Sequence, residues 1–376
     1  MTARLSIICL WISFSLLLML GLIMVASTGF CTSDANCVAK QCGFAVLGFG
    51  GALFLSATDY HKLRRWVWWG LGICTFLLIC CYLPFIGKGV NGEHRWLNLG
   101  LLTFQPSEVA KIVLMFTLAH WYTTHREIAG TFWKGFAIPG IIFGVPLLLI
   151  LMEKDMGTAA ALAMSGFCVM YVGGARSWLL LLSLLLGAVA LYLMTTGSEN
   201  RMLRIEAWFD PQAYSQGAGR QQWIAMLAFA RGGLFGVGLG DGLEKHGNLP
   251  FAHTDFIFAE IGEEWGFVGS VTVLLLYTVL TVSGIIMALK TTDTFGRLLA
   301  VGLVSTIFWP AMLNMAVVSS LLPNSGLPLP FISYGGTNLV FTIAAIGLLT
   351  SIQRHTPKPT DFYWPKRRQM EDPKLK

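Results

Sequence analysis

Ten runs of mainly apolar residues occupy most of this 376-residue chain. A helix needs about 20 such residues to cross the hydrocarbon core of a bilayer. Only 12% of the residues are charged and 55% are apolar, whereas soluble domains carry about a quarter charged residues. The chain therefore lacks the polar surface of a soluble enzyme or a disordered protein. Its apolar residues are also spread too widely for a single membrane anchor.

The runs predict an all-α polytopic membrane protein with ten transmembrane helices. The first run is long and weakly terminated, so we expect it to be retained rather than cleaved as a signal peptide. The second and tenth runs are the shortest. The predicted helices cover residues 5–27, 43–58, 66–84, 106–123, 136–152, 157–173, 177–195, 267–289, 298–319 and 339–353.

Charge placement predicts the orientation. With a cytoplasmic N-terminus, most of the 26 Lys and Arg residues lie inside, and most of the 20 acidic residues lie at or near the outer face. This agrees with the positive-inside rule, so the net charge of +6 is attributed to topology and not to nucleic acid. We expect one membrane domain, residues 1–355, with a large extracytoplasmic loop at 196–266 between helices seven and eight. Residues 356–376 form a basic cytoplasmic tail, which suits an anionic leaflet or serves as a solvated anchor.

The first polar outer segment covers residues 91–111. Glu108 and Lys111 are three positions apart and share one helix face, so they form either a structural ion pair or part of a ligand cavity. Arg95 beside Trp96 is either an interfacial pair or a grip for an anion. Pro106 suits the first position of a helix that Gln105 or Ser107 could cap.

The second and third segments carry acids beside apolar helices. Asp155 stands in the tight turn 153–158, which is either a solvated connection or part of a site at the mouth of the sixth helix. Asp255 precedes Phe-Ile-Phe-Ala, and a low dielectric there would raise its pKa toward that of a general base. Alternatively, Thr254 or Asp255 caps a helix that starts at Phe256.

The fourth segment, residues 321–337, has three prolines and three glycines and cannot form regular helix. Irregular backbone at membrane depth must be buried in protein or line a cavity. Gly335 and Gly336 permit close approach of a ligand or another helix. Cations on the outer side would suit an anionic lipid headgroup such as a pyrophosphate; they are Lys88, Arg95, Lys111, Arg201, Arg204, Arg220, Arg231 and Lys245.

Other signals carry less weight. The glycine-rich stretch 232–242 lacks the strand–turn–helix context of a nucleotide loop and is placed outside, where ATP is absent. No His, Cys and Asp arrangement has the spacing of a metalloenzyme. Cys31, Cys37 and Cys42 share one short loop, and two of them could pair in an oxidising compartment.

Taken together, the segments carry a family resemblance. The stretches "NGEHRWLNLG…FQPSEVAKI", "GGLFGVGLGDGLEK…LPFAHTDFIFAEIGEEWGFVG" and "LPNSGLPLPFISYGGTNLVF" resemble the SEDS family (shape, elongation, division and sporulation). The resemblance runs from about residue 5 to 355 and implies a ten-helix, GT-C-like fold in a bacterial cytoplasmic membrane.

The resemblance also implies an activity. Members polymerise lipid II into peptidoglycan glycan strands and release undecaprenyl pyrophosphate; a lipid II flippase is the alternative. Asp255 is the matching essential acid and the expected base. No cofactor is expected with certainty, although a divalent cation (Mg²⁺ or Mn²⁺) could bridge acid and pyrophosphate. The expected substrate-binding residues are Arg95, Trp96, Gln105, Ser107, Glu108, Lys111, Asp155, Arg204, Lys245, His253, Thr254, Glu264, Ser333, Tyr334, Gly335 and Gly336.

Within the family, the chain resembles the division-type (FtsW-like) branch more than the elongation-type (RodA-like) branch. Asn91-Gly92 and the stretch ending in Lys245 favour the former, whereas "GLPLPF" favours the latter. The expected partners are a class B penicillin-binding transpeptidase and other division proteins at the septum. The chain departs from the usual Gln-Pro-Asp-x-Gly at Glu153-Lys154 and from the usual Ser-Ser at Thr337-Asn338.

Overall fold

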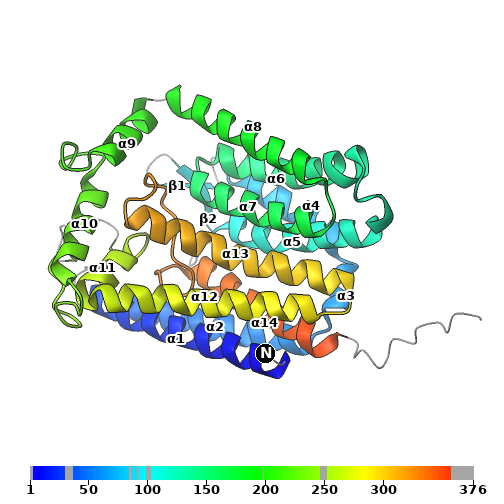
Figure 1. Cartoon of the computed structure of the whole chain (residues 1–376), viewed down its shortest axis with the longest axis horizontal. Coiled ribbons are helices and arrows are strands. Elements are labelled where there is room, and N and C mark those ends of the chain that lie inside the picture. Colours follow the sequence, from blue (N-terminus) through cyan, green and yellow to red (C-terminus); the bar gives the residue numbers. More distant parts are fainter. Residues whose placement is uncertain are drawn as a thin grey trace, which may run out of the picture.

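A computed structural model describes residues 3–29, 37–83, 87–90, 93–98, 103–197, 199–245 and 252–356. It is mainly helical (Figure 1). The helices are α1 (Ala3–Gly29), α2 (Cys37–Ala57), α3 (Tyr60–Arg64), α4 (Val67–Cys80), α5 (Pro106–Thr124), α6 (Ile138–Met152), α7 (Met156–Val172), α8 (Ser177–Thr196), α9 (Glu199–Phe209), α10 (Arg220–Gly232), α11 (Ile257–Glu264), α12 (Gly266–Lys290), α13 (Thr294–Val318) and α14 (Gly336–His355). A 3-10 turn, η1 (Arg126–Ile128), and a π-helical turn, η2 (Trp133–Ala137), precede α6.

Each predicted apolar run overlaps a helix of the structure. By length and composition, six helical segments can cross a membrane: Leu5–Thr28, Cys37–Ala57, Trp133–Met152, Gly266–Lys290, Thr294–Val318 and Gly336–His355. Shorter apolar helices occupy Val67–Cys80, Met156–Val172 and Ser177–Ala190. The chain is therefore a polytopic, helical membrane protein.

Helix α13 lies at the centre of the bundle and contacts α5, α7, α12 and α14. The most extensive pairing joins α14 to α2. Small residues permit this close packing, because a Cβ at Gly347 of α14 would lie 2.4 Å from the carbonyl oxygen of Ala52 on α2. Packing of this kind replaces the hydrophobic effect as the force between helices in a bilayer.

Helix α8 runs along the upper edge of the molecule in Figure 1, where it has little contact with α7. Its apolar side chains are largely exposed in the isolated chain, as at Leu181 and Leu185. Exposed leucines on an apolar helix suit contact with lipid chains.

One end of the bundle holds the non-helical elements. The strands β1 (Gly87–Val90), β2 (Glu93–Asn98) and β3 (Thr103–Phe104) form an antiparallel sheet, with Lys88 opposite Trp96. In Figure 1, α9, α10 and α11 lie at the left end, away from α3 and the N-terminus. The sequence predicted the long segment 196–266 and its helical stretch near 221–234, but not the sheet, whose short strands show no clear alternation of polar and apolar residues.

The α2–α14 packing predicts a sharp difference between two glycines. We expect Gly347→Ala to lower the free energy of unfolding by about 1–3 kcal/mol, because the new methyl group collides with the α2 backbone. Thermal unfolding in detergent measures the effect. Gly50→Ala on α2 is the control, since nothing lies within 4 Å of its Cβ position. Equal melting temperatures for the two variants would contradict the packing.

Candidate functional site

Asp255 lies just before α11, half buried, against the irregular segment that joins α13 to α14. A Cβ placed at Gly326 would be 3.4 Å from the Asp255 Oδ2 atom. Gly326 also has a φ of +66°, which favours glycine. The backbone of this connecting segment therefore forms one wall beside the carboxylate.

Helix α11 begins at Ile257, and Phe256 occupies the N-cap position without making a capping hydrogen bond. The alternative that Thr254 or Asp255 caps a helix starting at Phe256 is therefore wrong in the position of the helix start. Phe256 is instead buried in the core.

The connecting segment is tied to the residues around Asp255. Ser333 Oγ donates to the Thr254 carbonyl at 2.5 Å, and the Tyr334 amide donates to the His253 carbonyl at 2.9 Å. The aromatic rings of His253 and Tyr334 lie 5.8 Å apart. Burial lowers the pKa of His253, which favours its neutral form. These contacts join the third and fourth polar segments into one unit.

Gly335 and Gly336 serve contact between helices in this structure. The Gly335 amide donates to Gln41 Oε1 at 3.3 Å, and Gln41 Nε2 donates to the Ser333 carbonyl at 3.1 Å. A Cβ at Gly336 would lie 2.6 Å from the Phe44 ring. Helix α2 therefore approaches the segment that ends in Gly336.

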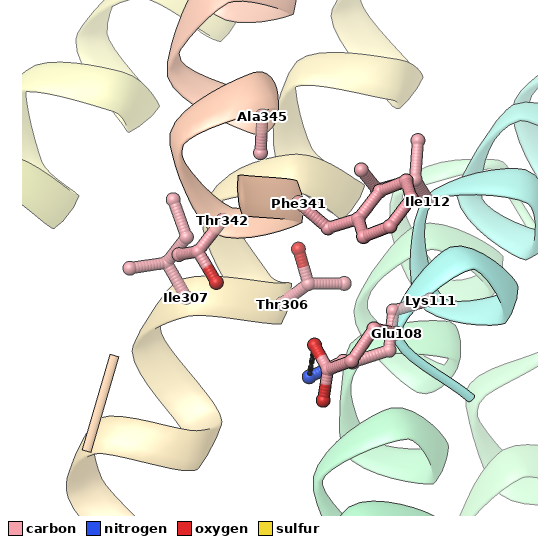
Figure 2. Close-up of a pocket in the computed structure, with 8 residues that line it drawn as sticks. All are labelled: Glu108, Lys111, Ile112, Thr306, Ile307, Phe341, Thr342 and Ala345. Carbon is pink, nitrogen blue, oxygen red and sulfur yellow. Dashed lines mark ion pairs between the residues drawn. The ribbon is translucent and has the colours of Figure 1, made fainter. Parts of the chain in front are cut away.

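Glu108 and Lys111 form a buried ion pair on α5, with Lys111 Nζ 2.7 Å from Glu108 Oε2 (Figure 2). Their side chains are only 3% and 8% exposed. Asn338 Nδ2 donates to the same Glu108 oxygen at 3.1 Å. Thr306 and Thr342 line the adjoining cavity, whose volume of about 10 Å³ suits one water molecule.

The Asp155 carboxylate is held by its own turn and by the first polar segment. Its Oδ1 caps α7 by accepting from the Thr158 amide at 3.0 Å, and its Oδ2 lies 3.5 Å from Gln105 Nε2 and 3.9 Å from Arg95 Nε. Arg95 also donates to the Lys154 carbonyl at 2.8 Å. Gln105 occupies the N-cap position of α5 but makes no capping bond there, because its amide faces Asp155.

Glu153 is a buried acid in the same turn. Neither carboxyl oxygen has a hydrogen-bond partner among the residues that the structure describes. Burial and, next, the negative charge of Asp155 raise the pKa of Glu153 to about 8, against weaker effects of Cys81 and Arg95. Glu153 is therefore mostly protonated at neutral pH.

A separate polar group joins the long outer segment to α1. Lys245 Nζ lies 2.5 Å from Glu264 Oε1 and 2.8 Å from Ser27 Oγ. Ser27 in turn donates to Glu264 at 2.7 Å. The Lys245 side chain is only 2% exposed, so a role in binding a pyrophosphate requires this pair to separate.

Arg231 of α10, Glu244 and two acids of α11 extend this polar group. Arg231 pairs with Glu244 and lies 3.8 Å from Glu263, which also accepts from the Leu243 and Glu244 amides. Burial and then the nearby negative charge of Glu263 raise the pKa of Glu260 to about 8. Its two oxygens lack hydrogen-bond partners in the described part of the chain. This cluster was not predicted from the sequence.

The other predicted residues occupy varied positions. Trp96 is half buried on β2, Ser107 is fully buried on α5, and Arg204 is exposed on α9. Cys37 is buried at the start of α2, Cys42 is exposed on the same helix, and Cys31 lies outside the described residues. So do the basic tail from residue 357 and Asn91-Gly92.

The four polar segments thus meet at one end of the bundle. The first and second join through Arg95, Gln105 and Asp155, and the third and fourth join through Ser333 and Thr254. Thr337 Oγ1 donates to the Thr103 carbonyl at 3.3 Å and links the fourth segment to the first. Gln41, Asn314 and Asn338, which hold these segments, were missed by the sequence analysis. A lone amide side chain in an apolar helix is a signal that could have found Asn314.

Comparison with known families gives one extended match. Residues 6–358 match the FtsW/RodA/SpoVE family model, described as "Cell cycle protein". The stage V sporulation protein E of Bacillus subtilis is 34% identical over 349 residues, covering 91% of this chain and 95% of that protein. A probable peptidoglycan glycosyltransferase FtsW of Thioalkalivibrio sulfidiphilus is 37% identical over 361 residues, covering 92% and 89%.

Solved structures share the fold. A chain from a peptidoglycan synthase complex, solved to show the structural coordination of polymerization and crosslinking, has a TM-score of 0.77 and 28% identity, covering 92% of this chain and 96% of that one. The rod shape determining protein RodA of Thermus thermophilus has a TM-score of 0.70 and 27% identity, covering 93% and 97%.

Glu153 predicts a pH-dependent stability. Its folded-state pKa, about 8, exceeds the ordinary value of 4.5, so its stabilising contribution is complete below pH 4.5 and is lost as the pH rises through 8. Glu153→Gln removes this titration. We therefore expect the variant to gain melting temperature relative to the parent protein between pH 5 and 9, as measured in detergent.

The same substitution at an exposed position provides the control. Glu127 lies on η1 and is exposed, so Glu127→Gln removes no buried carboxyl and we expect its melting temperature to differ from that of the parent protein by a constant amount. A constant difference for Glu153→Gln as well would show that the Glu153 carboxyl titrates normally.

Proposed function

The chain belongs to the FtsW/RodA/SpoVE family of cell cycle proteins, and on that premise we propose that it polymerises lipid II with Asp255 as the general base. It is a peptidoglycan glycosyltransferase that acts in cell wall synthesis. The observation that carries the assignment of the site is that hydrogen bonds and an ion pair link four polar segments of an otherwise apolar bundle, one of which contains the half-buried Asp255.

The proposed reaction joins two lipid II molecules. The 4-hydroxyl oxygen of an acceptor N-acetylglucosamine forms a bond to C1 of the donor N-acetylmuramic acid, and the bond from C1 to the pyrophosphate oxygen breaks. The hydroxyl proton passes to the Asp255 carboxylate, and undecaprenyl pyrophosphate leaves. A sugar hydroxyl is a weak acid, so a positioned base accelerates this step by about 10²–10⁴-fold.

Cations of the site stabilise the departing pyrophosphate in this proposal. Arg95 and Lys111 lie on the segments that meet near the acid, but each already faces a carboxylate, Asp155 and Glu108 respectively. The pyrophosphate must therefore replace these carboxylates as the partner. Arg204 is exposed on α9 and needs no such exchange for access by solvent.

The mechanism contains no step through a metal ion. Among the described residues, no three His, Cys, Asp or Glu side chains are placed to hold a metal together. If a divalent cation binds, Asp255 is the residue that would hold it, and the ion would supply positive charge to stabilise the departing pyrophosphate.

We further propose the setting in which the enzyme works. In this proposal, the chain crosses the membrane with ten helices and has both termini in the cytoplasm. The segment 196–266 then lies outside, and the end of the bundle with Asp255 faces the outer side of the bacterial cytoplasmic membrane. Similarity to proteins named FtsW supports a role in septal wall synthesis. Similarity to a chain of a peptidoglycan synthase complex supports a class B penicillin-binding transpeptidase as partner. The basic tail would rest on the anionic inner leaflet.

The assignment of the base predicts the behaviour of an isosteric variant. We expect Asp255→Asn to lower the rate of glycan polymerisation by at least about 100-fold, because the amide cannot accept the proton. The melting temperature should change little. The measurement is a glycan-strand gel with purified protein, its partner transpeptidase and lipid II.

Asp241→Asn is the matched control, because Asp241 is an exposed acid in the same long outer segment. It should polymerise lipid II at the parent rate. Full activity of Asp255→Asn would sink the proposed role of Asp255.

The proposed orientation has its own test. Alkaline phosphatase needs disulfides, which form outside the cytoplasm. We expect the enzyme to be inactive when fused after Lys376 and active when inserted after Gly217, in the turn between α9 and α10. The reverse pattern would show that the orientation is inverted.

A further inference from the structure

We propose that Asn314 is a positioning residue for Asp255; this inference rests on the proposed role of Asp255 as the base. Asn314 lies near the end of α13 and is 2% exposed. Its Nδ2 atom donates to the Asp255 carbonyl at 2.7 Å and to the Leu327 carbonyl at 2.6 Å. One side chain therefore holds the backbone at the acid and the backbone of the opposite wall.

We call the two hydrogen bonds from Asn314 Nδ2 the clamp, and their chemistry requires a primary amide. Both acceptors are carbonyl oxygens, so the NH₂ group of Asn314 must face them, and this fixes the orientation of the amide. The Asn314 Oδ1 atom has no hydrogen-bond partner among the described residues. An aspartate at this position has the same shape but donates only while it is protonated, and a leucine donates nothing.

The clamp sets the position of the Asp255 carboxylate. Leu327 directly follows Gly326, whose Cβ position lies 3.4 Å from Asp255 Oδ2. Fixing the Leu327 carbonyl relative to the Asp255 carbonyl thus fixes the wall beside the carboxylate. A base must stand within hydrogen-bond reach of the proton that it takes. A displacement of about 1 Å can cost about 10²-fold in rate.

A residue that only stabilises the fold provides the comparison for Asn314. Gln222 of α10 makes a comparable pair of bonds near the end of α13, donating to the Leu322 carbonyl at 2.9 Å and lying 3.5 Å from the Val317 carbonyl. It is 1% exposed and holds the beginning of the same connecting segment. Both of these acceptors lie before Leu327, and neither is Asp255. Gln222→Met is therefore a matched control for lost hydrogen bonds.

The first experiment compares kinetics at matched stability. With purified protein, its partner transpeptidase and lipid II, we expect Asn314→Leu to lower kcat by about 10–100-fold. The KM should change by less than about threefold, because the clamp positions the base and not the substrate. Gln222→Met should lower the melting temperature similarly and keep kcat within about twofold of the parent value.

The second experiment uses the pH dependence of Asn314→Asp. Protonation restores one donor to the clamp, so the ratio of this variant's kcat to the parent kcat should rise as the pH falls. Both proteins lose activity through protonation of the same base, Asp255, and this common loss cancels in the ratio. Each profile is normalised to its own value at one pH, so the comparison does not depend on the yield of the variant.

Opposite results would overturn the inference. Parent kcat in Asn314→Leu would do so, as would equal kcat losses in Asn314→Leu and Gln222→Met. A variant-to-parent kcat ratio for Asn314→Asp that stays constant with pH would also contradict it. Asp255→Asn is assayed in parallel: if that variant is active, the proposed base fails, whereas if it is inactive and Asn314→Leu is not impaired, the positioning role alone fails.

Discussion

The backbone of residues 319–335 imposes the constraint on which the rest of the site depends. This segment is irregular and largely withdrawn from solvent, so its carbonyl groups need donors from the protein. Side chains from five different helices supply them: Gln41 of α2, Trp208 of α9, Gln222 of α10, Tyr277 of α12 and Asn314 of α13. These bonds join the bundle to the wall beside Asp255. The stability of the fold and the geometry of the acid therefore depend on the same hydrogen bonds.

The ionic groups of the site are held in closed pairs. Lys111 faces Glu108, and Lys245 faces Glu264, with both pairs almost fully buried. Buried ion pairs are weak contributors to stability because desolvation offsets their attraction. In the proposed reaction, these lysines serve charge chemistry with an anionic substrate. A pyrophosphate that displaces Glu108 from Lys111 would recover the attraction without a new desolvation of the lysine.

The sequence indicated the helices and the residues with chemical character more reliably than their contacts. Long apolar runs predicted helices at ten places where the structure has one, and the apolar residues after Asp255 singled out that acid as the proposed base. The cap at Thr254 or Asp255 was wrong, because helix α11 starts one residue later and buries Phe256. The sheet around Trp96 was missed, since strand pairing across a turn leaves no strong alternation in six residues. Gln41 and Asn314 were missed because their partners lie far away in the sequence.

The amino-acid sequence by itself determined that this chain is a helical membrane protein, because the length of its apolar runs and its small number of charged residues do not depend on tertiary contacts. It also determined which acids and cations are available for chemistry. Only the tertiary structure decided which of them meet: Gln41 donates to Ser333 across 292 positions, and Asn314 bridges Asp255 and Leu327. The physical reason is that the free energy of moving a side chain out of water is a property of that side chain alone. A hydrogen bond instead requires two groups at about 3 Å, and helix packing sets that distance.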